Sequence, residues 1–135
     1  MGQGSIIGYE INKKTCQISF YNEKDLEPDT LEVDTDNYQI PLIIGKLRDT
    51  WAYGKEAKRL VTIKDGFTAT RLLSKSLAGD KIEFGEETYD AVWLLSQFIQ
   101  MSLQSFPEID GIVFTVPSLS EEMAQMLRGI AVRMN

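Results

Sequence analysis

The sequence contains no histidine, only one cysteine, and fewer basic than acidic residues. Its 14 Lys and Arg residues against 20 Asp and Glu residues give a formal net charge of -6. Binding to nucleic acid depends on clustered Lys and Arg that neutralise phosphates, so this charge argues against a nucleic-acid partner. The same negative sign disfavours a role on an anionic membrane surface.

The single cysteine, Cys16, excludes an intramolecular disulfide and fits a reducing compartment. A thiol nucleophile needs a neighbouring base, and the chain has no histidine to supply one, so we predict a buried structural role for Cys16. The N-terminus lacks the basic region and the long apolar run of a secretory signal. We therefore predict a cytoplasmic protein.

A tight hairpin is predicted near the N-terminus. Apolar residues dominate Ile6–Ile11, and apolar and polar residues alternate over Cys16–Phe20, as in two half-buried strands. The turn between them is Asn12-Lys13-Lys14, where Asn12 is the residue best able to adopt a left-handed conformation. Glu10 is the one acidic residue on the first strand. Burying its carboxylate would cost free energy, so we expect it to be exposed or bound to something.

Periodicity predicts further elements along the chain, including a helix near Ala69 to Leu77 that Gly79 closes. The clearest helix spans Glu86 to Ser105, with acidic residues in its first turns, and its polar residues argue against a membrane span. The run Ile112–Val116 is typical of a central strand covered on both faces. Ser118 and Glu121 have the spacing of a capping box that begins a last helix. The acidic segment Asn22–Asp36 is predicted as a solvated edge strand with loops, because it lacks the glycine and spacing of a calcium loop.

Several segments, in the same order, resemble the actin-like ATPases, and in particular the seventy-kilodalton heat-shock chaperones (DnaK-type). The residues Gly8 to Lys14 resemble their first phosphate-binding motif, Gly-x-Asp-Leu-Gly-Thr-Thr. Further matches are the Pro-led strand Ile40–Ile44, the Gly-x-x-Ala-Lys turn Gly54–Lys58, the strand and acidic turn Ile82–Glu87, and the most specific piece, Gly111–Pro117 with its trailing helix.

The resemblance implies an α/β fold with the ribonuclease-H-like mixed sheet of actin-like ATPases and flanking helices. Residues 1–135 would form a single domain, an incomplete N-terminal lobe fragment in which about 61–85 are a small inserted subdomain. ATP and Mg would be cofactors of the parent protein, held in part by the hairpin residues Glu10, Asn12, Lys13, Lys14 and Thr15, with Glu10 acting on the metal through water. Other catalytic groups come from later sequence in the family, so this chain alone would not hydrolyse ATP.

Four positions of the hairpin depart from the family's pattern. Glu10 replaces Asp and adds a methylene, which would displace a magnesium-bound water. A displacement of about 1 Å in the position of a reacting group can lower the rate by about 100-fold. Asn12 replaces a glycine, and Lys13 and Lys14 replace hydroxyl residues. One register also places Thr70 where the family has its catalytic lysine. These changes favour a second interpretation, a pseudo-ATPase scaffold without nucleotide chemistry.

Partners follow from the same interpretation. The remainder of its own ATPase domain would cover this fragment, and apolar surface left exposed would favour a homodimer. A third hypothesis is an unrelated α/β interaction domain in which Glu10 is a surface residue. A two-metal nuclease is disfavoured, because only Glu10 among the carboxylates lies on a suitable strand.

Overall fold

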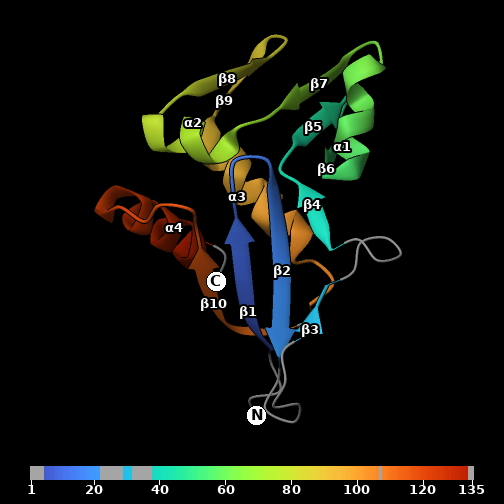
Figure 1. Cartoon of the computed structure of the whole chain (residues 1–135). Helices are drawn as coiled ribbons and strands as arrows, with labels where there is room; N and C mark the ends of the chain where they lie inside the picture. The colour runs from blue at the N-terminus through green and yellow to red at the C-terminus, as the bar shows by residue number, and fades with distance from the viewer. Residues whose placement is uncertain (1–4, 22–28, 32–37, 107, 134–135) are drawn as a thin grey trace.

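The computed structural model of the chain describes residues 5–21, 29–31, 38–106 and 108–133 (Figure 1). Its strands are β1 (Ser5–Ile11), β2 (Thr15–Tyr21), β3 (Asp29–Thr30), β4 (Gln39–Pro41), β5 (Ile44–Leu47), β6 (Thr50–Tyr53), β7 (Gly66–Ala69), β8 (Lys81–Phe84), β9 (Glu87–Asp90) and β10 (Ile109–Thr115). Its helices are α1 (Lys55–Arg59), α2 (Leu72–Ala78), α3 (Ala91–Ser102) and α4 (Glu121–Arg133), with a 3-10 helix, η1 (Leu60–Thr62). Most of the predicted segment Asn22–Asp36 lies outside these residues.

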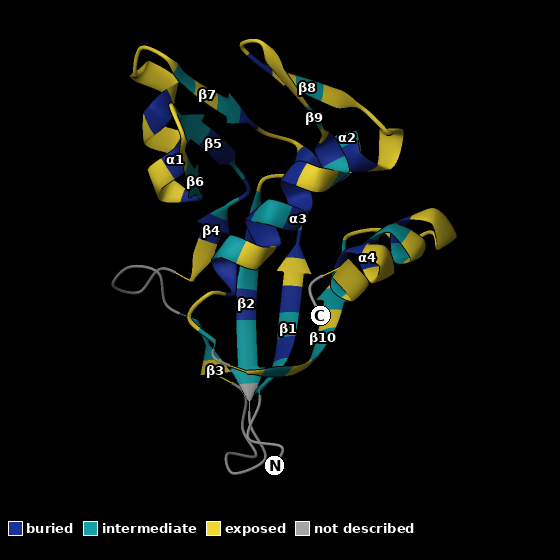
Figure 2. Cartoon of the chain, turned by 180° about the vertical axis from the view of Figure 1, so that it is seen from behind, coloured by how far each residue is buried: buried dark blue, intermediate teal, exposed yellow. Residues whose placement is uncertain are grey.

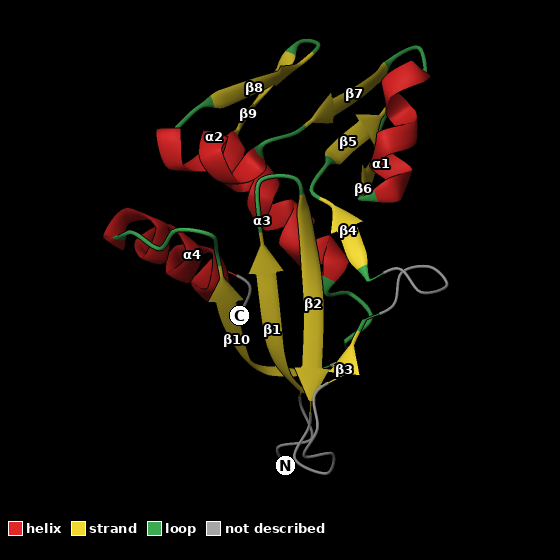
Figure 3. Ribbon diagram, viewed as in Figure 1, coloured by secondary structure: helices red, strands yellow, loops and turns green. Residues whose placement is uncertain are grey.

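The main sheet is mixed. Its strand order is β10-β1-β2-β3, and β4 also pairs with β2. β1 runs antiparallel to β2 and parallel to β10, so a hairpin and a crossover meet on one strand. The predicted hairpin and the mixed α/β sheet with flanking helices are confirmed (Figure 3).

The core lies between one face of this sheet and α3. Side chains alternate along β1, so that Ile7, Tyr9 and Ile11 are fully buried. α3 crosses the same face, as the two opposite views show (Figures 1 and 2). Its buried residues include Leu94, Leu95, Phe98 and Ile99. The apolar residues of this helix do not all lie on its buried face, since Trp93 is 38% exposed.

A smaller sheet follows the main one. Its strand order is β6-β5-β7, and α1 and η1 lie beside it, while β8 and β9 form a separate hairpin. In Figures 1 and 3 this sheet and this hairpin lie together beyond the turn end of the β1–β2 hairpin. The chain thus places a second layer of structure over one end of the main sheet.

The predicted helix over 86–105 begins too early. Residues Glu87–Asp90 instead form β9, which pairs in register with β8 across a turn at Gly85 and Glu86. Gly85 has a φ of 66°, which suits a tight hairpin turn. The acidic residues that suggested a helix N-terminus are therefore strand and turn residues, and α3 begins only at Ala91.

The segment before α2 also differs from prediction. A helix was expected from about Ala69, but Ala69 ends β7, and α2 begins at Leu72. The predicted stop at Gly79 is confirmed, because this residue caps the helix with a φ of 73°. Residues 66–69 form the strand β7 because they pair with β5, with four successive residues of the two strands in register.

β10 is not the central strand that its apolar sequence suggests. Within the described residues it pairs with β1 alone, and Val113 is 61% exposed. The capping residue of α4 also differs: Ser120, rather than Ser118, accepts a hydrogen bond from the Met123 amide at 3.1 Å. α4 buries Met123, Leu127 and Ile130, whereas Leu119 precedes the helix and is 69% exposed.

Candidate functional site

Glu10 lies near the end of β1, on the face of the sheet that α3 does not cover. Its neighbours Tyr9 and Ile11 are buried toward α3, so the alternation of a strand directs Glu10 to the opposite face, where it is exposed. Across the ladders, Glu10 pairs with Thr115 of β10 and Gln17 of β2. The carboxylate therefore stands on an open sheet face among small and polar residues.

The turn after Glu10 is closed by the side chain of Asn12. Its Oδ1 accepts hydrogen bonds from the backbone N–H of Lys14 at 2.9 Å and of Thr15 at 2.7 Å, and from the Thr15 hydroxyl at 3.2 Å. Asn12 does not have the positive φ that we predicted, because an Asx turn forms the bend instead. Two turn amides that would face a phosphate are thus bound within the turn.

The two turn lysines are exposed. The backbone carbonyl of Lys14 accepts a hydrogen bond from the Leu42 amide at 2.8 Å, which ties the turn to the segment after β4. Thr70, the position matched to a catalytic lysine, lies exposed between β7 and α2. Among the described residues, no group of three or more Cys, Asp and Glu side chains is placed to hold a metal ion.

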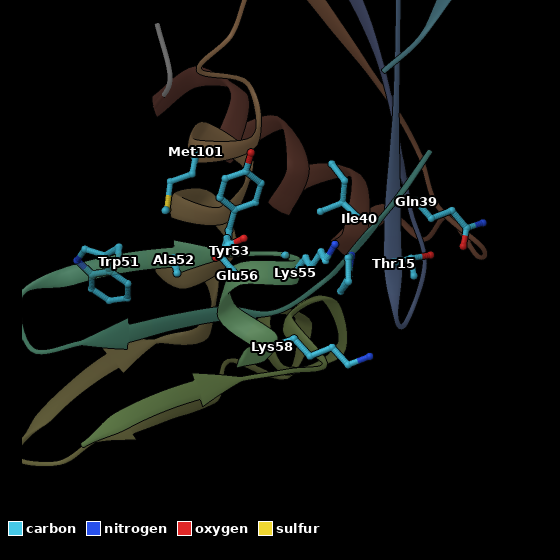
Figure 4. A pocket seen from close by; sticks show the side chains of 12 residues that line it. Thr15, Gln39, Ile40, Trp51, Ala52, Tyr53, Lys55, Glu56, Lys58 and Met101 are labelled. Atoms are coloured by element: carbon cyan, nitrogen blue, oxygen red, sulfur yellow. The ribbon is translucent and has the colours of Figure 1, made fainter. Parts of the chain in front are cut away.

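A pocket of about 820 Å³ lies beside the hairpin, and we did not predict it. It is lined by Thr15, by β4, by residues 51–56, by Lys58 and by Met101 (Figure 4). Of the five predicted site residues only Thr15 contributes to it, whereas Glu10, Asn12, Lys13 and Lys14 do not. No local sequence motif predicts such a pocket, because four separate segments of the chain meet to form it.

An aromatic cluster joins the small sheet to the β8–β9 hairpin and α3. The Trp51 ring contacts Tyr89 and Trp93, with centroids 5.3 Å and 5.6 Å away. The Lys46 ammonium lies 5.2 Å from the Trp51 centroid and donates to the Tyr89 hydroxyl and to Glu87, each at 3.1 Å. The hydrogen bond to Tyr89 raises the pKa of Lys46, and the one donated by Tyr89 lowers the pKa of Glu87. The cluster fixes how the second layer packs.

A buried polar network lies under the hairpin. The hydroxyls of Tyr9 and Ser102 are 2.6 Å apart, the Ser102 hydroxyl donates to the Ile99 carbonyl at 2.7 Å, and the Cys16 thiol donates to Tyr9 at 3.7 Å. Cys16 is 1% exposed, which confirms its predicted burial. Burial raises the pKa of the Cys16 thiol to about 12.

We expect Cys16 in the folded protein to resist thiol reagents at pH 8, because the thiolate is the reactive form. A group whose pKa is raised on folding stabilises the fold below its unfolded pKa, near 9, and this stability is lost as the pH rises toward 12. The measurement is labelling with a disulfide reagent, with and without urea. One thiol per chain should react only after unfolding, and rapid labelling without urea would contradict the buried site.

None of the helices in the described part of the chain combines the length and hydropathy needed to span a bilayer. That finding concerns the expected helix over 86–105 most directly, since it is shorter than predicted.

Comparison with known proteins gives one family and a structural neighbour. Residues 27–135 match the model of the C-terminal part of a family of unknown function (DUF5716). No curated protein matches the sequence. Among solved structures, a non-polymerising mutant of MamK bound to AMPPNP matches with a TM-score of 0.67 and 11% identity, over 99% of this chain and 39% of that one. This likeness to an actin-like ATPase supports the general fold.

Proposed function

The chain belongs to a family of unknown function (DUF5716 C-terminal) and folds like an actin-like ATPase, and we propose that it is part of an actin-like nucleotide-binding domain. It spans about two fifths of the MamK chain, so the proposal concerns the larger protein that carries it. In this proposal the chain contributes the first phosphate-binding hairpin of the N-terminal lobe and is not catalytically complete alone.

The observation that carries the proposal is the position of Glu10 in a fold like that of a nucleotide-bound protein. Its exposed carboxylate stands near the C-terminal end of β1, beside the parallel strand β10. Ligands of α/β sheets commonly bind outside the carboxyl ends of their strands. Glu10 would orient a Mg²⁺-bound water, while Lys13, Lys14 and Thr15 would lie near the phosphates of ATP.

The uncovered sheet face supports a partner within the same protein. Alternate residues of β1, β2 and β10 form this face, and they are small or polar at Gly8, Ser19 and Gly111. Such residues permit close packing of another element. We propose that the remainder of the ATPase domain covers this face in a cytoplasmic protein, and that a homodimer replaces this contact when the remainder is missing.

Calorimetric titration of Mg-ATP into the full-length protein tests the nucleotide site. We expect binding that Glu10→Ala weakens by about tenfold, because the variant loses the carboxylate that holds the metal water. Glu83→Ala is the matched control, since Glu83 is also an exposed strand glutamate but lies on β8. Equal affinity in the two variants would overturn the role of Glu10.

The Asn12 turn favours a second candidate, a scaffold without nucleotide chemistry. Its Oδ1 already occupies the amides of Lys14 and Thr15, so a phosphate has to displace it. If the folded full-length protein gives no heat with Mg-ATP, and Asn12→Gly gives none either, the scaffold becomes the better proposal. Binding that appears or tightens in Asn12→Gly would assign the blocked amides to a nucleotide site.

A further inference from the structure

A chain of three hydrogen bonds with a fixed direction runs beneath the β1–β2 hairpin. The Ser102 hydroxyl donates its single proton to the Ile99 carbonyl at 2.7 Å. At the 2.6 Å contact between the hydroxyls of Tyr9 and Ser102, the proton therefore comes from Tyr9. The Tyr9 oxygen accepts in turn from the Cys16 thiol at 3.7 Å. The chain of bonds thus leads from β2 through β1 to the last residue of α3.

All three side chains in this chain of bonds are shielded from water. Tyr9 is 0% exposed, Cys16 is 1% exposed and Ser102 is 2% exposed. A hydrogen bond between buried groups is stronger than one in water, and a buried group that loses its partner has no water to replace it. The two hydroxyls are therefore held in one arrangement.

These bonds supply a directional contact between the hairpin and α3. Apart from Tyr9 and Cys16, the side chains that β1 and β2 bury are aliphatic, namely Ile7, Ile11 and Ile18. Apolar contacts are non-directional, so they allow small shifts of a strand along a helix. A hydrogen bond keeps its length and angle within narrow limits. The bond between Tyr9 and Ser102 therefore fixes the position of the hairpin along α3.

The bond lies where the strands beside the hairpin end. Glu10 is the last residue of β1 that pairs with β10, opposite Thr115. On the β2 side, pairing extends further along the hairpin, to Thr15 opposite Pro41. In the described part of the chain, the turn is thus supported by a neighbouring strand on the β2 side alone. Tyr9, one residue before Glu10, anchors the β1 side instead.

We propose that Tyr9 and Ser102 are positioning residues for the hairpin site, an inference that takes its ligand from the proposed nucleotide function. Tyr9 points to α3 and Glu10 points to the opposite face, so a tilt at this end of β1 moves the carboxylate and the turn together. A displacement of about 1 Å can lower the rate of a reaction by about 100-fold. The two hydroxyls hold the hairpin against such a displacement and act on the ligand only through Glu10 and the turn.

Three variants of the full-length protein separate positioning from stability. Tyr9→Phe and Ser102→Ala each leave one buried hydroxyl without its partner, so each should lower the free energy of unfolding. The double variant removes both hydroxyls, which is nearly neutral for stability when the shape is kept. A role in stability alone would therefore be restored in the double variant, whereas the positioning of the hairpin would not.

The two readouts are calorimetric titration with Mg-ATP and hydrogen exchange of the turn amides by mass spectrometry. In the double variant we expect the affinity for Mg-ATP to fall by about tenfold. We also expect the amides of Lys14 and Thr15, which bind Asn12, to exchange about tenfold faster, because a loosely held turn opens more often. The midpoint of urea unfolding should stay close to that of the wild type.

Ser96→Ala is the matched control. Ser96 is also a buried serine of α3, 5% exposed, and lies outside the chain of bonds. Its substitution should change the affinity and the exchange rate by less than about twofold. Equal effects of Ser96→Ala and of the double variant would overturn the proposal.

The outcomes distinguish this inference from the nucleotide function itself. Wild-type exchange of the turn amides in the double variant would overturn the positioning role, and so would wild-type affinity for Mg-ATP. Recovery of both values in the double variant, after losses in both single variants, would assign the two hydroxyls to stability alone. If the wild-type protein gives no heat with Mg-ATP, the proposed nucleotide function fails, and the exchange rates alone decide whether Tyr9 and Ser102 position the turn.

Discussion

Replacing Phe98 with alanine is expected to lower the free energy of unfolding by about 3–5 kcal/mol. Phe98 is 0% exposed at the middle of α3, between the main sheet and the small sheet, where its ring meets Tyr53 at 5.7 Å. Truncation removes the apolar contact and leaves a cavity that the surrounding rigid elements cannot fill. Since domains are stable by about 5–15 kcal/mol, this loss is a large share of the total.

Urea unfolding followed by circular dichroism measures the effect. The midpoint should fall while the slope stays the same, since the area exposed on unfolding changes little. Gln100→Ala is the control, because Gln100 is exposed on the same helix, and it should shift stability by less than about 0.5 kcal/mol. Similar shifts in the two variants would show that α3 does not fill the core as described.

The second large effect is expected at Gly54, which precedes α1. Its φ of 64° and ψ of -134° belong to a region that glycine adopts readily and other residues avoid. A Cβ there would also lie 2.8 Å from the Ile40 Cγ2. Backbone strain and overpacking each cost about 1–3 kcal/mol, so we expect Gly54→Ala to destabilise the fold by about 3 kcal/mol.

Two other glycines separate these causes. Gly79 has a φ of 73° but open space around its position, so Gly79→Ala measures the conformational cost, which we expect to be about 1 kcal/mol. Gly111 has no positive φ and also has open space, so Gly111→Ala should be nearly neutral. If Gly54→Ala costs no more than Gly79→Ala, the contact with Ile40 yields easily and that part of the prediction is wrong.

The sequence predicted elements where its periodicity was unambiguous. The predicted segments Ile6–Ile11 and Cys16–Phe20 are strands, as expected for segments that are buried on one side. The long helix is also present, although it begins at Ala91. The elements that it misassigned depend on distant pairing. β7 is a strand because it pairs with β5, and β9 because it pairs with β8, and neither partner is evident from local sequence.

The candidate sites show the same division. The position of Glu10 on an exposed strand end could be read from the pattern, whereas the Asx turn at Asn12 depends on a side-chain conformation that propensity does not distinguish from a left-handed one. The pocket could not be predicted, since Thr15, Tyr53 and Met101 come from three elements whose packing the sequence does not reveal. The nucleotide and metal roles of the hairpin remain predictions.

The aromatic cluster at Lys46 has an optical consequence. The chain contains two tryptophans, Trp51 and Trp93, and their ring centroids are 5.6 Å apart. When the protein is excited at the red edge of the tryptophan absorption band, nearly all its intrinsic fluorescence therefore comes from one place, where the small sheet meets α3. Because Trp51 also lines the pocket, this natural fluorophore pair reports on opening of that joint and on ligands beside it, without any added dye.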